Sequence, residues 1–311
     1  MSDDDLLYNV AKLYYEQRRT QLEIAKAVKT SRSTVSRLLE KAVERNIITI
    51  KISYPGRRNS DLEQRLMSCF ELQDVRVLDS DHGSEETILA GTGVLAAELI
   101  DNYVKDGHIL GISYGRSLAS TAAALNPGRH VALTVVPIIG ALCSGNNEID
   151  GPELVRQFAK AYGGEYHYLP GPLLVRDAQT RDLLLKLPQI SETLALAKKS
   201  DLVVIGIGEV SQASPIWSGY LDKRRIDWVT SRGGIGHMCG QFFDENGQIL
   251  MISTNQRSIG IGLKGLRGIG RVIAVASGKQ KAAAIRGAMR GRFFNVLVTD
   301  VAAANAILNL N

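Results

Sequence analysis

The amino-acid sequence predicts an α/β protein in which a small helical module precedes a larger, mainly parallel sheet covered by helices. Apolar residues recur at helical spacing before Asn46, whereas from Asp74 onward short apolar strands alternate with helical stretches. Strands that are apolar on both faces are typical of parallel sheets covered by helices. The length of 311 residues suits two domains, and the stretch "YPGRRNSD" breaks regular structure between them. We therefore predict domains at 1–56 and 57–311.

The net charge is concentrated in the helical module. Of the 37 basic and 32 acidic residues, residues 1–58 hold 12 basic and 7 acidic ones, and the remainder holds 25 of each. The whole formal net charge of +5 therefore belongs to the N-terminal segment 1–58, which ends with Arg57 and Arg58 just after the predicted boundary. A small basic module on an electrically neutral body is typical of nucleic-acid binding.

Composition argues against several other classes of protein. Cys69, Cys143 and Cys239 are far apart and form no CxxC pair, so the sequence predicts neither a zinc site nor disulfides. Apolar runs stay short of the roughly 18 residues that a membrane span needs. The N-terminus is acidic where a secretory signal would be basic. We expect a cytoplasmic protein with no metal, no cofactor and no membrane partner.

Three short helices are expected in the module. The first spans residues 3–17, and the second begins at Thr20, which forms a capping box with Glu23. The third begins after Ser31, a predicted N-cap. The expected buried positions of the second and third helices are Leu22, Ile24, Ala25, Val28, Val35, Leu38, Leu39 and Ala42.

The spacing of the second and third helices is that of a helix-turn-helix. Ala25 is small where the helices must cross closely. Lys29 occupies the turn position where glycine is usual, and a left-handed backbone there would cost it roughly 1 kcal/mol. Short hydroxyls and arginine can reach bases or phosphates from a major groove. The DNA-binding candidates are Ser31, Arg32, Ser33, Thr34, Ser36, Arg37 and Lys41. A helical hairpin with a solvated basic face is the alternative.

Two further elements are expected next along the chain. Ile48, Ile50 and Ile52 alternate with polar residues, which predicts a strand that could be part of a wing. The segment 61–70 places Leu62, Leu66 and Phe70 on one face of a helix. This face could pack on the core or against a second subunit in a dimer.

Apolar runs and the turns between them predict the strands and helices of the second domain, 57–311. Strands are expected at 74–80, 108–113, 130–139, 201–208, 271–277 and 295–300. Helices are expected near 84–104, 115–124, 152–162, 279–290 and 301–308. Asn246-Gly247 predicts a β-hairpin inside "GQFFDENGQILM".

Ligands of such sheets collect at the carboxyl ends of the strands. Polar groups follow the strands in "GISYGRS", "IGIGEV" and "VASGKQK", and a lone histidine follows "GGIG". Amides at a helix start, hydroxyls and cations could hold a phosphate there. The ligand-binding candidates are Gly111, Ser113, Gly115, Arg116, Ser117, Gly208, Glu209, His237 and Lys281.

Other interpretations of these candidates stay open. Glycines in such loops can be present only because the backbone turns there. Lys281 could be a solvated helix lysine, and His237 could be a residue whose hydrogen bonds are satisfied within the protein. The sequence contains no zinc motif or Walker loop, and we predict no enzyme and no catalytic residue.

The order of these motifs resembles the SorC-type sugar-responsive transcriptional regulators of bacteria, over nearly the whole chain. The DNA-binding part of the resemblance is "LYYEQRRTQLEIAKAVKTSRSTVSRLLEKAVERNIITIKI". The remainder rests on "GISYGRSLAS", "VPIIGA", "YLPGPLLV", "GQFFDENGQ" and "GKQKAAAIRGAMRGRFFNVLVTD". The resemblance implies a winged helix-turn-helix and an effector domain related to ribose-phosphate isomerase and glucosamine-phosphate deaminase folds.

The resemblance also implies a homotetramer on operator DNA. It implies a sugar, phosphosugar or polyol effector in a pocket lined by the loop 115–117 and Lys281. Where relatives commonly have Gly-Asp, this chain has Gly236-His237, which favours an unusual or more anionic effector. The expected function is effector-controlled DNA binding, as a repressor or an activator. The alternatives are a sugar-phosphate isomerase or deaminase with a DNA-binding head, and a constitutive DNA-binding protein with a degenerate pocket.

Overall fold

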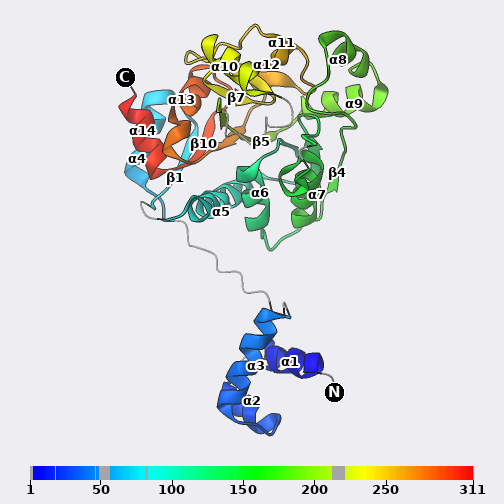
Figure 1. Cartoon of the computed structure of the whole chain (residues 1–311), viewed down its shortest axis with the longest axis vertical. Coiled ribbons are helices and arrows are strands. Elements are labelled where there is room, and N and C mark those ends of the chain that lie inside the picture. Colours follow the sequence, from blue (N-terminus) through cyan, green and yellow to red (C-terminus); the bar gives the residue numbers. More distant parts are fainter. Residues whose placement is uncertain are drawn as a thin grey trace. The chain divides into compact units, whose positions relative to one another are not determined.

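The computed structural model describes residues 3–17, 19–45, 47–48, 57–80, 83–143, 145–211 and 221–310. The chain divides into two units, Met1–Ser53 and Tyr54–Asn311, each compact by itself (Figure 1). Within the described ranges, no helix has both the length and the apolar composition that a membrane crossing requires.

The first unit contains three α-helices in its described part. They are α1 (Asp3–Ala11), α2 (Gln21–Ala27) and α3 (Arg32–Glu44), and a π-helical turn, η1 (Lys12–Glu16), extends α1. The predicted capping box is confirmed, because the Glu23 amide donates to Thr20 Oγ1 (3.3 Å) and the Thr20 amide to Glu23 Oε2 (2.8 Å). The predicted N-cap of α3 is also confirmed, since Ser31 Oγ accepts from the Thr34 amide.

The core of this unit joins all three helices. Its buried members are Val10, Ile24, Ala25, Val35 and Leu39. The prediction for Leu22 is wrong, because this side chain is 57% exposed. Successive residues of an α-helix are about 100° apart, so Leu22 and Ile24 point to nearly opposite sides of α2.

The turn between α2 and α3 has the left-handed residue that a helix-turn-helix requires. Lys29 has φ +54°, and the next amide, that of Thr30, donates to Ala25 O at 2.8 Å. The predicted wing strand lies outside the described residues at Ile50 and Ile52. Ile48 is described, and it packs against the core of the unit.

A seven-stranded sheet forms the centre of the second unit. Its order is β1-β10-β9-β5-β2-β3-β4, and every neighbouring pair is parallel, which confirms the predicted fold class. The strands are β1 (Asp74–Leu78), β2 (Ile109–Ile112), β3 (Thr134–Pro137), β4 (Glu165–Tyr166), β5 (Leu202–Gly206), β9 (Val272–Val275) and β10 (Val296–Asp300).

The direction of each crossover decides which face a helix covers. From β1 to β4 the chain crosses the sheet one way, through α5 (Glu85–Tyr103), α6 (Arg116–Ala124) and α7 (Gly151–Tyr162). From β4 to β10 it returns, through α9 (Pro188–Ala197) and α13 (Ala282–Arg290). Because parallel crossovers are right-handed, the two runs cover opposite faces. Figure 1 shows α5, α6 and α7 together along the lower edge of this unit.

The remaining helices extend these layers. Next to α13 lies α14 (Val301–Asn309), which contacts α4 (Ser60–Phe70). Leu62 and Leu66 of α4 are buried in the main core, as the core-packing alternative requires. Shorter elements are α8 (Ala178–Leu184), α10 (Lys223–Ser231), α11 (Ser253–Gln256), α12 (Gly262–Leu266), η2 (Asn147–Ile149) and η3 (Lys279–Lys281).

A second, small sheet is antiparallel, and its strands pair in sequence order. They are β6 (Gly208–Glu209), β7 (Gly236–Met238) and β8 (Gln241–Phe243). The predicted turn at Asn246-Gly247 is confirmed, since the Gly247 amide donates to Asp244 O at 3.0 Å. Beyond it, a single bridge between Phe243 and Ile249 replaces the expected second strand. A second turn, at Cys239-Gly240, joins β7 to β8 with two left-handed residues and was not predicted.

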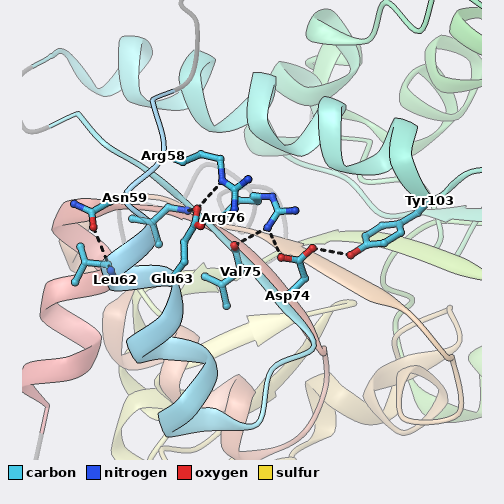
Figure 2. Close-up of polar contacts among 9 residues, drawn as sticks. Arg58, Asn59, Leu62, Glu63, Asp74, Val75, Arg76 and Tyr103 are labelled. Atoms are coloured by element: carbon cyan, nitrogen blue, oxygen red, sulfur yellow. Dashed lines mark hydrogen bonds and ion pairs between the residues drawn. The ribbon is translucent and has the colours of Figure 1, made fainter.

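The edge of the large sheet at β1 is closed by the first described residues of the second unit. Arg58 bridges Leu78 in antiparallel fashion, and the Asn59 amide donates to Val77 O at 2.9 Å. The Arg58 guanidinium points toward the Glu63 carboxylate (Figure 2). It donates two hydrogen bonds to it, from Nε to Oε1 at 2.9 Å and from Nη2 to Oε2 at 2.6 Å. Glu63 is only 3% exposed and also accepts from the Val77 amide. This pair therefore fastens the start of the unit to β1.

We predict that Arg58→Ala destabilises the second unit by about 1–2 kcal/mol, because it leaves the buried Glu63 carboxylate without its cation. Urea unfolding of the full chain measures the change. Arg57→Ala is the matched control, since the Arg57 side chain is exposed and its backbone oxygen still accepts from the Asp79 amide. Equal stability of the two variants would contradict this role of the pair.

Candidate functional site

A cavity of about 380 Å³ opens where the sheet connections change direction. β2 and β5 are neighbours, but the chain leaves β2 toward β3 and leaves β5 toward β9, on the opposite side. The connections after these two strands therefore diverge, and a crevice forms at their carboxyl ends. Residues that follow β2, β5 and β9 line the cavity.

Eight of the nine predicted ligand-binding residues line this cavity. They are Ser113, Gly115, Arg116, Ser117, Gly208, Glu209, His237 and Lys281. Gly111 is not among the lining residues, so the prediction for it is not supported. It lies within β2, where an added Cβ would come 2.7 Å from both Ile138 Cγ2 and Val203 Cγ2. Its missing side chain is explained by close packing at the sheet.

The start of α6 forms one wall of the cavity. Gly115 has φ +116°, a conformation that favours glycine, and its amide donates to Ile149 O at 2.9 Å. The chain then enters α6 with Arg116 and Ser117 in the first turn, so the positive end of the helix dipole faces the cavity. Ser113 and Ser117 are buried and supply hydroxyls. This wall offers hydrogen-bond donors and one cation.

Lys281 supplies a second cation from the turn after β9. Burial lowers the pKa of its ammonium, and repulsion from Arg116 lowers it further, while Glu209 acts in the opposite sense. Two cations that repel each other across a cavity are both stabilised by an anion placed between them. The electrostatics of the cavity therefore favour a ligand with a negative group.

His237 lies in β7 and lines the cavity next to β6. Burial, and then the charge of Lys281, lower its pKa to about 3, so its imidazole is neutral near pH 7. In the β6–β7 ladder His237 is paired with Gly208. An added Cβ on Gly208 would lie 2.0 Å from His237 Nε2, so only glycine leaves room for the ring. A neutral imidazole can donate a hydrogen bond to a ligand hydroxyl or accept one from it.

Several cavity residues were missed from the sequence. Glu85 in the first turn of α5 lines the cavity and forms an ion pair with Arg116. Glu85 and its neighbour Glu86 are acidic residues at a helix start, a feature that helix stability explains by itself. The other missed lining residues are Leu89, Tyr114, Ile149, Gly206, Ile207, Met238, Cys239, Ser277 and Gln280. The side of the cavity formed by α5 depends on tertiary packing alone.

The predicted DNA-binding residues share α3 and its N-cap. Arg32, Ser33, Thr34 and Arg37 are exposed, whereas Ser36 and Lys41 are half-buried. Ser31 is exposed, but its hydroxyl is already used as a cap and lies 2.8 Å from both Ser33 Oγ and Thr34 Oγ1. The exposed end of α3 thus carries hydroxyls and two arginines, the groups suited to phosphates and base edges.

A helix-turn-helix unit joined to an α/β unit with a ligand cavity at its switch point defines the class of transcriptional regulators that carry their own effector domain. The chain belongs to the SorC-type sugar-binding regulator family. The family model described as "Putative sugar-binding domain" matches residues 54–309. This confirms the family predicted from the sequence motifs.

Relatives that match the full length of the chain include operon regulators and transcriptional regulators. The sorbitol operon regulator of Klebsiella pneumoniae is 32% identical and covers 99% of both chains. The deoxyribonucleoside regulator of Bacillus subtilis is 29% identical over 98% of this chain and 97% of the relative. The crystal structure of full-length SorC from Klebsiella pneumoniae matches 99% of this chain and 100% of its own, with a TM-score of 0.77 and 29% identity. The predicted class, a DNA-binding transcriptional regulator, is thereby confirmed.

We predict that His237 makes stability fall in mild acid. Its pKa of about 3 in the folded chain lies below the ordinary 6.5, so between these pH values the unfolded chain binds the proton and the folded chain does not. The free energy of unfolding therefore decreases as pH falls from about 6.5, by at most about 1.4 kcal/mol per pH unit for this group.

Urea unfolding between pH 4.5 and 7 measures this dependence. His237→Gln should have a shallower slope than the unchanged chain, and His167→Gln, which alters an exposed histidine, should keep the original slope. An unaltered slope in His237→Gln would show that the buried imidazole is not the cause.

Proposed function

We propose that this chain is a transcriptional regulator whose operator binding is controlled by a sugar, a sugar phosphate or a polyol bound in the cavity. The observation that carries the proposal is the convergence of Arg116, Lys281 and the start of α6 on a cavity at the switch point of the sheet. Cations and a helix N-terminus suit an anionic group such as a phosphate. Buried hydroxyls, Glu209 and the neutral His237 suit the hydroxyls of a carbohydrate.

The relatives support this class of effector. Their names refer to sorbitol, to deoxyribonucleosides and, for a protein of Brucella abortus, to erythritol catabolism. These compounds, or the sugars they contain, are small and rich in hydroxyls. We therefore place the effector of this chain in the same chemical class and assign its recognition to Ser113, Gly115, Ser117 and Gly208 together with the polar groups named above.

The unit before the domain boundary is proposed to bind operator DNA, with 1–56 as the DNA-binding domain and 57–311 as the effector and oligomerisation domain. Ser33, Ser36 and Arg37 are the preferred base contacts, with Arg32, Thr34 and Lys41 beside them. The likeness to SorC-type regulators supports a homotetramer that acts in the cytoplasm without a membrane partner. It also supports a regulator that does not convert its ligand, and product formation from a sugar phosphate would contradict that part.

We predict that a compound of the proposed class stabilises the chain by about 2.7 kcal/mol at 100 times its dissociation constant. Thermal-shift assays with sorbitol, erythritol, deoxyribose and their phosphate esters measure the effect. Lys281→Met should remove most of the shift given by a phosphate ester, because a cation next to the ligand is lost. Lys279→Met is the matched control, since Lys279 lies in the same turn but does not line the cavity.

The same assay can reject the assignment of a phosphate group. If only the unphosphorylated sugars or polyols raise the melting temperature, and Lys281→Met responds like the unchanged chain, Arg116, Ser117 and Lys281 do not bind a phosphate.

We predict that Arg37→Ala weakens operator binding by about 1–3 kcal/mol, because an arginine that grips a guanine contributes that much to base discrimination. Mobility-shift titration on an operator selected from random duplexes by the full chain measures the loss. Arg45→Ala removes the same charge from the other end of α3, where Arg45 pairs with Asp4, and should change affinity little. Equal losses in both variants, or an equal loss on random DNA, would indicate a charge effect without base reading.

A further inference from the structure

The Arg116 guanidinium, which is more exposed than the Lys281 ammonium, already has an ion-pair partner within the chain. Its partner is the carboxylate of Glu85, with Arg116 Nη2 donating to Glu85 Oε1. Both residues line the cavity. The Arg116 side chain is 50% exposed and that of Glu85 is 63% exposed, so the pair lies at the mouth and in contact with solvent.

An ion pair with this exposure is easily exchanged. Exposed pairs contribute only about 0.2–1 kcal/mol, because water screens both partners. Glu85 also interacts favourably with its own helix, since it lies in the first turn of the 19-residue helix α5, where the positive end of the helix dipole attracts negative charge. A competing anion can therefore take Arg116 from Glu85 at small cost.

The position of Lys281 makes the exchange depend on the charge of the ligand. Arg116 and Lys281 repel each other, and Glu85 and Glu209 both offset the cost of the buried ammonium. An anionic ligand would supply that compensation itself and make Glu85 dispensable. A neutral ligand supplies none, so the pair between Glu85 and Arg116 would stay in place.

Building on the proposed function, we propose that Glu85 selects effectors by charge. It occupies Arg116 while the cavity holds no anionic ligand, gives up Arg116 to the anionic group of a sugar phosphate, and keeps it when a neutral polyol binds. Glu85 is thus an internal competitor, a specificity-determining residue for the cavity.

Glu85→Gln tests the proposal, because it removes the charge and keeps the shape. Glu86→Gln is the matched control: it removes the same charge from the same turn of α5, and Glu86 does not line the cavity. Isothermal titration of the full chain at constant ionic strength would use inorganic phosphate, sorbitol 6-phosphate and sorbitol as probes. We expect Glu85→Gln to bind the two anionic probes about 2- to 5-fold more tightly, the loss of one exposed competing ion pair. Glu86→Gln should bind them as the unchanged chain does.

A second variant shows whether the gain acts through Arg116. In an Arg116→Gln background, Glu85→Gln should tighten the binding of phosphate less than it does in the unchanged chain, because the contested cation is gone and only the weaker interaction of Glu85 with Lys281 is removed. Sorbitol affinity should be the same with and without the Glu85 carboxylate.

The outcomes separate this proposal from the proposed function. Unchanged or weaker phosphate binding in Glu85→Gln relative to Glu86→Gln overturns it, as does an equal gain for sorbitol or a failure of phosphate to bind any variant. If phosphate distinguishes the variants but no sugar, polyol or phosphate ester of the wider panel binds, the role of Glu85 stands and the proposed effector class is wrong.

Discussion

The parallel pairing of β2 with β5 is the constraint on which the rest of the second unit depends. The two strands lie side by side, but the crossovers that follow them run in opposite directions. Their carboxyl ends cannot be closed by a common connection, so a cavity remains there. The segments that leave β2, β5 and β9 all enter it, and they bring hydroxyls, two cations and a histidine from positions more than 150 residues apart. The candidate site is therefore a consequence of topology before it is a consequence of side-chain chemistry.

The electrostatics of the cavity are balanced within the chain. Arg116 and Lys281 repel each other, and Glu85 and Glu209 offset part of that cost. His237 stays neutral because it is buried beside Lys281, and it can be buried there only because Gly208 has no side chain. A neutral histidine adds a hydrogen-bonding group without adding to the positive charge. The cavity can thus hold hydroxyl groups and an anion at the same time.

The two units are stabilised by different kinds of contact. The first unit depends on local signals, since capping by Thr20 and Ser31 and the left-handed Lys29 set the angle between short helices. The second unit begins with Arg58 bound to the buried Glu63 and bridged to β1 (Figure 2). That attachment covers an edge strand, which would otherwise present unpaired backbone groups. It also gives the segment after the predicted boundary a defined starting point on the sheet.

The sequence by itself determined those features that depend on neighbours along the chain. The capping box at Thr20, the N-cap at Ser31, the six predicted strands and the turn at Asn246-Gly247 were predicted because their causes lie within a few residues. Eight of the nine predicted ligand-binding residues line the cavity, because they directly follow apolar strands or a glycine turn.

Only the tertiary structure decided how these elements meet. Gly111 was indistinguishable from a loop glycine until its packing against Ile138 and Val203 was known, and Leu22 was apolar in sequence but exposed in the fold. The return path through β4, α8 and α9 and the turn at Cys239-Gly240 carry no strong local pattern. The role of Glu85 at the cavity requires α5 to be placed beside α6, a contact between residues 31 positions apart. Such contacts follow from strand order and crossover handedness, which a single local pattern does not encode.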